Sequence, residues 1–188
     1  MELLDAHHTA MDGFDRIVRR ATDQDWSLPT PCTEWNVRDL VNHLVYEQLW
    51  APELLHGATL EEVGDRFDGD VLGEDPAASW TEAAGNARAA FAEPGALDRS
   101  VHVSVGQIPA TDYGWQMITD LAVHGWDLAT AIGVPSAIGD ELANQLLEIA
   151  RPQVDSWQAA GIFAPPVETA TDAPPTDQLV ALLGRQPR

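Results

Sequence analysis

The stretch Asn36–Val45 reads NVRDLVNHLV and carries the signals of a helix that buries one face. The side chain of Asn36 can cap the helix, and Asp39 can reach back to the backbone of Asn36 as in a capping box. The apolar residues recur at intervals of three and four, which places them on one stripe: Val37, Leu40, Val41, Leu44 and Val45. The stretch therefore predicts an amphipathic helix over about residues 37–56.

A second stretch of this kind, Asp120–Gly133, reads DLAVHGWDLATAIG. It continues an apolar stripe formed by Met117, Leu121, Leu128 and Ala131. Glycine is the residue that most often follows the end of a helix, because it adopts the left-handed conformation without strain. We therefore predict a helix over about residues 111–132 that stops at Gly133.

Two more amphipathic helices are predicted in the first half of the chain, at residues 2–21 and from Pro76 to near Pro94, with a glycine-rich and acidic loop over 57–75. Alternating valines predict a short hairpin near 100–108. Beyond residue 135 we expect a helix over 140–160, kinked or split at Pro152, and a short one over 176–183. The predicted fold is mainly all-α: a four-helix bundle (1–135) with a helical C-terminal extension (136–188) packed on it.

The charge balance excludes several functions. The 188 residues include 30 Asp and Glu against 10 basic residues, all of them Arg, which gives a formal net charge of −20. Such a charge repels nucleic acids and anionic membranes, and the lack of lysine excludes Schiff-base chemistry. A single cysteine, Cys32, excludes an internal disulfide. Residues 1–20 lack the apolar run of a signal peptide or a membrane span, so we expect a cytoplasmic protein.

Asp120 and His124 are the first candidates for chemistry. They are four residues apart and therefore project from the same face of their helix, beside the inward stripe. A buried carboxylate needs a hydrogen-bonded partner or a metal ion to compensate its charge. The spacing alone leaves two interpretations open, namely a local ion pair between the two residues and a metal site.

His43 favours the metal site. It lies in the middle of the helix predicted over 37–56, at the edge of the apolar stripe, where a facing helix can reach it. Helix bundles assemble metal sites from inward side chains on facing helices, and two histidines with one carboxylate are a common open set for zinc or another divalent metal. The alternative is a histidine at the edge of the core that is hydrogen-bonded to a carbonyl.

The remaining candidates are weaker. Asp127, three residues after His124, can accept a hydrogen bond behind the site or lie exposed on the helix flank. Cys32 precedes a helix N-terminus, which favours a thiolate, but a buried structural thiol is the simpler interpretation. We expect solvent exposure for His7, His8, His56 and His102, with the alternative that one of His7 and His8 faces into the bundle. Core or pocket-lining positions are expected for Trp35, Trp115 and Trp126.

Three stretches of the chain resemble one known family. They are TPCTEWNVRDLVNHL at Thr30–Leu44, DLAVHGWDLATAIG at Asp120–Gly133, and the tail FAPPVETATDAPPTDQLVALLGRQP. Together they resemble the DinB-like metal-binding superfamily, in the branch that contains the N-terminal domain of mycothiol-dependent maleylpyruvate isomerase and its uncharacterised relatives. The resemblance implies an up-down four-helix bundle. It also implies a divalent metal, zinc in the first place and nickel as the alternative, held by residues at the positions of His43, Asp120 and His124. Position 120 commonly holds His or Glu in this family.

The resemblance further implies thiol-dependent chemistry. Characterised members use mycothiol, bacillithiol or glutathione in isomerisation or S-transfer, so the expected partners are a small-molecule thiol and an electrophilic substrate. A thiol that carries carboxylates needs an arginine, and Arg38, one turn before His43, is the candidate anchor; the alternative is a surface ion pair. A non-catalytic metal or small-ligand binding module and a metal-free bundle are the competing hypotheses. Seven tryptophans also leave room for an apolar dimer patch.

Overall fold

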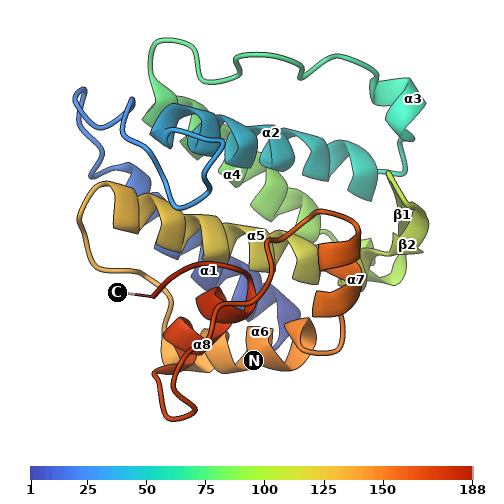
Figure 1. Cartoon of the computed structure of the whole chain (residues 1–188). Helices are drawn as coiled ribbons and strands as arrows, with labels where there is room; N and C mark the ends of the chain where they lie inside the picture. Colours follow the sequence, from blue (N-terminus) through green and yellow to red (C-terminus); the bar gives the residue numbers. More distant parts are fainter. Residues whose placement is uncertain (188) are drawn as a thin grey trace.

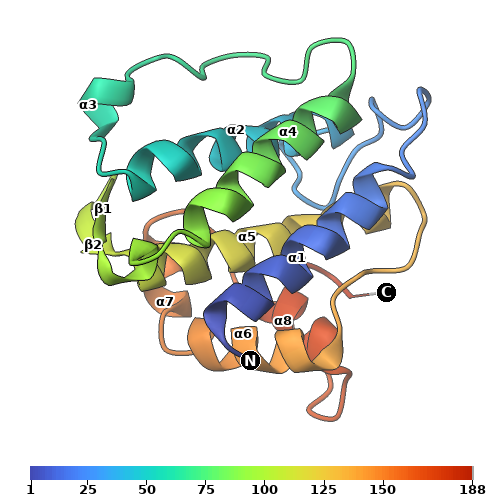
Figure 2. The ribbon, with the colours of Figure 1, turned by 180° about the vertical axis from the view of Figure 1, so that it is seen from behind.

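The computed structural model describes residues 1–187, in which eight α-helices and one β-hairpin are found. Four long helices form the bundle: α1 (Leu3–Val18), α2 (Val37–Leu55), α4 (Pro76–Phe91) and α5 (Ala110–Ala131). α2 packs against α4 and α5, and α1 packs against the other side of α4 and α5, so the four helices enclose one core (Figures 1 and 2). This confirms the predicted mainly helical bundle.

The ends of the bundle helices follow the sequence signals. The Asn36 side chain accepts a hydrogen bond from the backbone of Asp39, and the Asp39 carboxylate accepts one from the backbone of Asn36, which completes the predicted capping box of α2. Asp75 caps α4 ahead of Pro76. α5 is followed by Gly133, whose φ of 72° is the left-handed conformation expected there. Local capping therefore fixes where these helices begin and end.

The bundle does not alternate direction at every step. α1 and α5 run one way, and α2 and α4 run the other way (Figures 1 and 2). α4 runs in the same direction as α2 because the segment 56–75 carries the chain back along the bundle before α4 starts. It contains a short helix, α3 (Leu60–Val63), that the sequence analysis did not predict, with a capping box of its own from Thr59 and Glu62.

A two-stranded antiparallel hairpin connects α4 to α5 through a 3-10 turn (Ala96–Asp98). Its strands are β1 (Ser100–Val103) and β2 (Gly106–Pro109), with Val103 opposite Gly106 at the closed end. This confirms the hairpin predicted near 100–108. The turn residue Val105 is left 83% exposed, an unusual position for a large apolar side chain.

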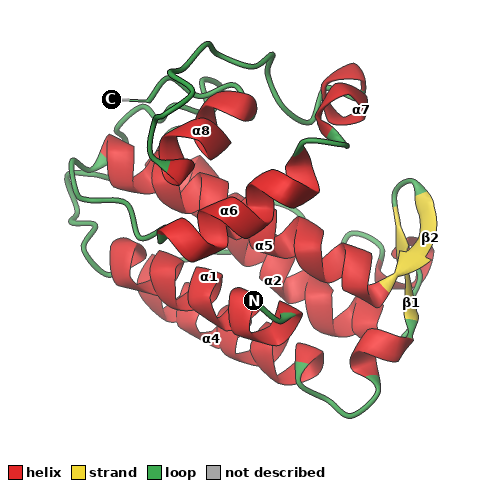
Figure 3. Cartoon of the chain, turned by 90° about the horizontal axis from the view of Figure 1, so that it is seen from below, coloured by secondary structure: helices red, strands yellow, loops and turns green. Residues whose placement is uncertain are grey.

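The C-terminal segment adds α6 (Asp140–Ala150), α7 (Val154–Ala159) and α8 (Pro175–Leu182). α6 and α7 are separated around Pro152, as predicted from the missing backbone donor of proline. α8 packs on α6, which lies below α5 in Figure 1 and in front of it in Figure 3, the view from below. Their apolar residues join the core of the bundle, among them Leu142, Leu146, Leu179 and Leu183. Within residues 1–187, no helix is both long and apolar enough to cross a membrane.

His7 is buried, and the prediction that it faces solvent is wrong. The ring lies on the inward face of α1 against Phe91, and neither ring nitrogen has a hydrogen-bond partner. Burial, together with the nearby charges of His8 and Arg88, lowers the pKa of His7 to about 3. On α1, His7 falls on the same buried face as Ala6 and Ala10. The apolar spacing of residues 2–21 did not reveal this, because His7 is not itself apolar.

His7 should make the protein sensitive to acid. An ordinary histidine has a pKa near 6.5, so below that pH the unfolded chain binds a proton that the folded chain does not. Stability is therefore retained above about pH 6.5 and lost as the pH falls toward 3. Between pH 7 and pH 5 the free energy of unfolding should fall by about 2 kcal/mol more in the wild type than in His7→Leu. Urea unfolding at several pH values measures this difference, and a difference independent of pH would contradict it.

Candidate metal centre

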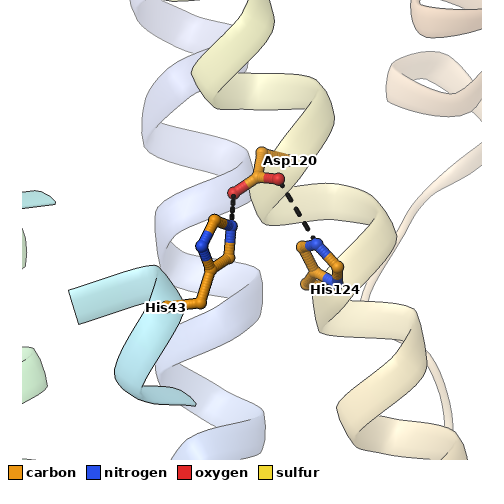
Figure 4. A group of neighbouring side chains, drawn as sticks. All are labelled: His43, Asp120 and His124. Carbon is orange, nitrogen blue, oxygen red and sulfur yellow. Dashed lines mark hydrogen bonds and ion pairs between the residues drawn. The ribbon is translucent and has the colours of Figure 1, made fainter. Parts of the chain in front are cut away.

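His43, Asp120 and His124 converge on one point between α2 and α5 (Figure 4). The Asp120 carboxylate lies between the two imidazoles: one oxygen is 3.1 Å from Nε2 of His43 and the other is 3.4 Å from Nε2 of His124. In a tetrahedral zinc site with bonds of about 2.0–2.1 Å, donor atoms lie roughly 3.3 Å apart. One donor atom from each of the three residues lies within 4.8 Å of the others. The three donors thus fit a divalent metal ion.

The electrostatics of the three residues are strongly coupled. Burial alone lowers the pKa of His124, but the charge of Asp120 and its hydrogen bonds with Asp120 and Asp127 raise it to about 9. Asp120 likewise outweighs the effect of burial and raises the pKa of His43. Burial tends to raise the pKa of Asp120, but the two histidines hold it well below its usual range. An ionised carboxylate is therefore kept at the centre of the site, as a metal ligand requires.

Asp127 and Arg185 continue the network behind His124. The Asp127 carboxylate accepts a hydrogen bond from Nδ1 of His124 at 3.0 Å, which leaves Nε2 of that ring for the site. Arg185 donates to the same carboxylate from Nε and Nη2, at 3.3 and 2.9 Å. Asp127 is completely buried and Arg185 is 7% exposed. Such a partner fixes the tautomer and the orientation of a metal-ligating histidine.

The backbone of the C-terminal segment places Arg185 at this point. Its amide donates to the carbonyl of Val180 at the end of α8. The preceding residue, Gly184, has a φ of 82°, and a Cβ there would lie 2.7 Å from the carbonyl oxygen of Ala164. Only glycine accommodates both the left-handed conformation and this close approach. Gly184 and Arg185 are therefore held close to Ala164 beside the site.

The loop before α2 covers the site with an aromatic ring. Trp35 lies with its ring centroid 4.7 Å from that of His43 and 5.3 Å from that of His124. The Thr30 hydroxyl donates to the carbonyls of Cys32 and Trp35, which fixes the turn. The capping box of Asn36 anchors the same loop to the helix that carries His43. One local structure thus positions both the ligand and its aromatic cover.

An open cavity of about 550 Å³ leads to the three donors. One wall is the loop 31–35, and the other is formed by residues 161–164 with Gly184 and Arg185. Its size lies within the range of small-molecule sites, about 300–1,000 Å³. A metal ion at the donors would have open coordination positions facing this space, which is the arrangement of catalytic rather than structural sites.

A second cavity of about 260 Å³ also reaches His43 and Asp120. Its apolar wall comes from the hairpin, α5 and the segment 157–163 and includes Val105, Met117, Trp157, Ile162 and Phe163. Glu47, one turn after His43, also lines it. Burial and the charge of Asp120 outweigh the two histidines and raise the pKa of Glu47 to about 7. The sequence analysis missed this residue, although its spacing of four from His43 was a usable signal.

Arg38, the candidate thiol anchor, lies away from the three donors and is paired on the surface. Its guanidinium donates to the Asp70 carboxylate at 2.8 Å and to the carbonyl of Gly73, both in the segment that returns to α4. Arg38 lines neither of the two cavities. Arg38 forms the surface ion pair that was the alternative interpretation to a thiol anchor. The arginine beside the site is Arg185, which sequence reasoning missed because 58 residues separate it from Asp127.

The other candidates take mostly ordinary positions. Cys32 is half-buried in the wall of the larger cavity, and burial raises the pKa of its thiol, so the expected stabilisation of a thiolate does not apply. His56 is exposed, as predicted, and bonded to Glu93. Contrary to the expectation of exposure, His8 and His102 are only partly exposed. Trp126 is buried and Trp115 is partly buried, in agreement with their predicted core positions.

Fold and side chains together define a DinB-like helical bundle with a candidate His/Asp metal site between two of its helices. The model of the family described as "Mycothiol maleylpyruvate isomerase N-terminal domain" matches residues 7–129. The chain therefore belongs to the mycothiol maleylpyruvate isomerase N-terminal domain family. Two uncharacterised proteins of Mycobacterium tuberculosis, one from each of two strains, are each 34% identical to it over 194 residues, and the alignments cover both chains completely.

Solved structures support the fold. The crystal structure of mycothiol-dependent maleylpyruvate isomerase matches with a TM-score of 0.65 at 17% sequence identity, and that of a single-site mutant with 0.66 at 16%. In both cases the match covers 86% of this chain and 73% of the other. The predicted family and fold are thereby confirmed.

Proposed function

We propose that this protein binds a divalent metal ion at His43, Asp120 and His124 and uses it to activate a low-molecular-weight thiol of the mycothiol type for S-transfer or isomerisation. The observation that carries the proposal is the position of the three donors: they meet at the inner end of an open cavity instead of being enclosed by protein. Two nitrogens and one carboxylate oxygen suit zinc, with nickel as the alternative. Membership of the family supports the choice of thiol.

The residues around the donors have separable roles. Asp127 and Arg185 hold the His124 ring so that Nε2 faces the cavity. Trp35 shields the donors from water on one side, which strengthens electrostatic interactions there. When bound, the metal would lower the pKa of a coordinated thiol and present it as a thiolate. No side chain of the protein needs to act as the nucleophile, in keeping with the raised pKa of Cys32.

The first test is metal content, followed by thiol binding. Protein purified without a metal-binding tag should contain close to one zinc or nickel per chain by elemental mass spectrometry. Calorimetric titration with mycothiol should then detect binding to the metal-loaded protein and none to the metal-free protein. Metal uptake without affinity for mycothiol, bacillithiol or glutathione would overturn the proposal and leave a non-catalytic metal-binding module.

Arg38→Ala provides a specific control for the location of the thiol. Because Arg38 is held by Asp70 and lines neither cavity, its removal should change the dissociation constant for mycothiol by less than about twofold. Calorimetry with the metal-loaded variant checks this expectation. A tenfold loss of affinity would restore Arg38 as the anchor and would place the thiol on the outer face of α2.

A further inference from the structure

The smaller cavity beside His43 and Asp120 has the chemistry of a binding site for an uncharged, mainly apolar molecule. Two of the three large apolar side chains that residues 1–187 leave exposed line this one cavity: Val105 at 83% and Ile162 at 59%. They come from segments far apart in the sequence, the hairpin turn and the loop after α7. Exposed apolar side chains that gather at a hollow are a mark of ligand sites.

The charges of the lining disfavour an anionic ligand in the metal-free protein. The ionisable side chains in the described wall are His43, Glu47, Asp120 and Tyr113, with no arginine among them, and the chain has no lysine. A carboxylate placed here would face the carboxyl groups of Asp120 and Glu47, and the one imidazole in the wall, His43, is already paired with Asp120 at 3.1 Å, so the cost in free energy is large. The larger cavity differs in this respect, because Arg185 lies in its wall.

The two cavities meet at the donors. His43, Asp120, Ile162 and Phe163 line both of them, whereas His124 and Arg185 line only the larger and Glu47 lines only the smaller. A molecule in the smaller cavity would therefore contact His43 and Asp120 next to one in the larger cavity. Its volume of about 260 Å³ lies just below the usual range for drug-sized ligands, so the occupant is small.

We infer that the smaller cavity binds the electrophilic substrate, and that this substrate is a small, uncharged and mainly apolar molecule rather than a dicarboxylate. Only the role of this molecule as the substrate rests on the proposed function. Binding of an uncharged apolar molecule at this place follows from the lining alone and is tested without metal or thiol.

The test compares two molecules of nearly equal shape, acetophenone, which is uncharged, and benzoate, which is anionic. Both are titrated into the metal-free and the metal-loaded protein and followed by the NMR signal of the Trp157 indole N–H. Acetophenone should bind at least roughly tenfold more tightly than benzoate to the metal-free form, in which no metal ion faces the cavity. Equal or tighter binding of benzoate to the metal-free protein, or no response of Trp157 to acetophenone, would overturn the inference.

Three variants locate the binding. Val105→Asp puts a charge on the cavity wall at an exposed turn position, where a polar side chain is tolerated, so this variant should fold and bind acetophenone several-fold more weakly. Leu60→Asp, at an exposed apolar residue away from the cavity, should bind like the wild type. Gln116→Arg adds a cation to the wall and should tighten benzoate binding roughly tenfold. Equal effects of the two Asp variants would overturn the location.

The outcomes separate the two proposals. Acetophenone binding at Trp157 in a protein that takes up neither metal nor mycothiol would support the cavity and reject the proposed function. Metal and mycothiol binding together with turnover of maleylpyruvate, which is a dicarboxylate, and without acetophenone binding would support the function and reject the inferred substrate class.

Discussion

His124→Ala should lower the affinity of the protein for Zn²⁺ by more than about 100-fold. Loss of a residue that merely orients a ligand typically costs 10- to 100-fold in metal affinity, and loss of a ligand costs more. His124 offers Nε2 as one of the three donors, so its removal leaves the metal with only two of these protein ligands. The measurement is a competition titration with a chromophoric chelator, supported by the metal content of the purified variant.

The other two donors should behave in a graded way. His43→Ala should lose metal like His124→Ala, and Asp120→Asn should lose it because the amide removes the negative charge while keeping the shape. Asp120→Glu retains the carboxylate, so it should still bind metal. His56→Ala, at an exposed histidine bonded only to Glu93, is the matched control and should match the wild type. Stoichiometric metal in both His43→Ala and His124→Ala, with far-ultraviolet spectra unchanged, would show that these residues are not ligands.

Arg185→Ala should reduce the free energy of unfolding by about 3–5 kcal/mol, the usual cost of leaving one member of a buried ion pair without its partner. The Asp127 carboxylate is completely buried and accepts hydrogen bonds from Nε and Nη2 of the guanidinium group within 3.3 Å. Without Arg185, the Asp127 side chain keeps, among residues 1–187, only its bond to His124. Urea unfolding at pH 7 measures the change, and a loss below about 1 kcal/mol, the size expected of an exposed pair, would contradict it.

A double-mutant cycle measures the interaction between Arg185 and Asp127 apart from the contacts that each makes with other residues. Arg185→Met with Asp127→Leu removes both charges and keeps apolar volume, so it should be closer to the wild type in stability than Arg185→Met alone. The same double variant should bind Zn²⁺ about 10- to 100-fold more weakly, because the His124 ring loses the acceptor that orients it. Strictly additive stability effects would show that the two side chains do not act as a pair.

Much of the fold was predictable because it depends on local interactions. The capping box of Asn36 and Asp39, the stop at Gly133 and the separation of helices near Pro152 each involve residues within a few positions of one another. The short helix α3 and the direction of α4, which runs parallel to α2, were not predicted. Whether a capping signal inside a polar loop forms a helix depends on weak contacts that periodicity does not reveal.

The three donors were predicted for a similar reason. Asp120 and His124 share a helix face by spacing alone, and His43 lies beside the buried stripe of α2, so a bundle that packs α2 on α5 brings the three together. His7 shows the limit of this reasoning. A histidine at the edge of the apolar stripe of an amphipathic helix can face either the core or the solvent. In α1 the ring of His7 faces the core, where it packs against Phe91.

Hydrophobic periodicity and capping signals act within a few turns of the chain, so they predict the long helices, their ends and the residues that could meet at a metal. The surroundings of these residues depend on how the helices pack. The buried pair of Asp127 and Arg185 joins residues 58 positions apart, and the apolar cavity combines the hairpin, α5 and the segment after α7. Such contacts arise when helices pack and loops close over them, and no local pattern encodes which distant side chains will then be neighbours.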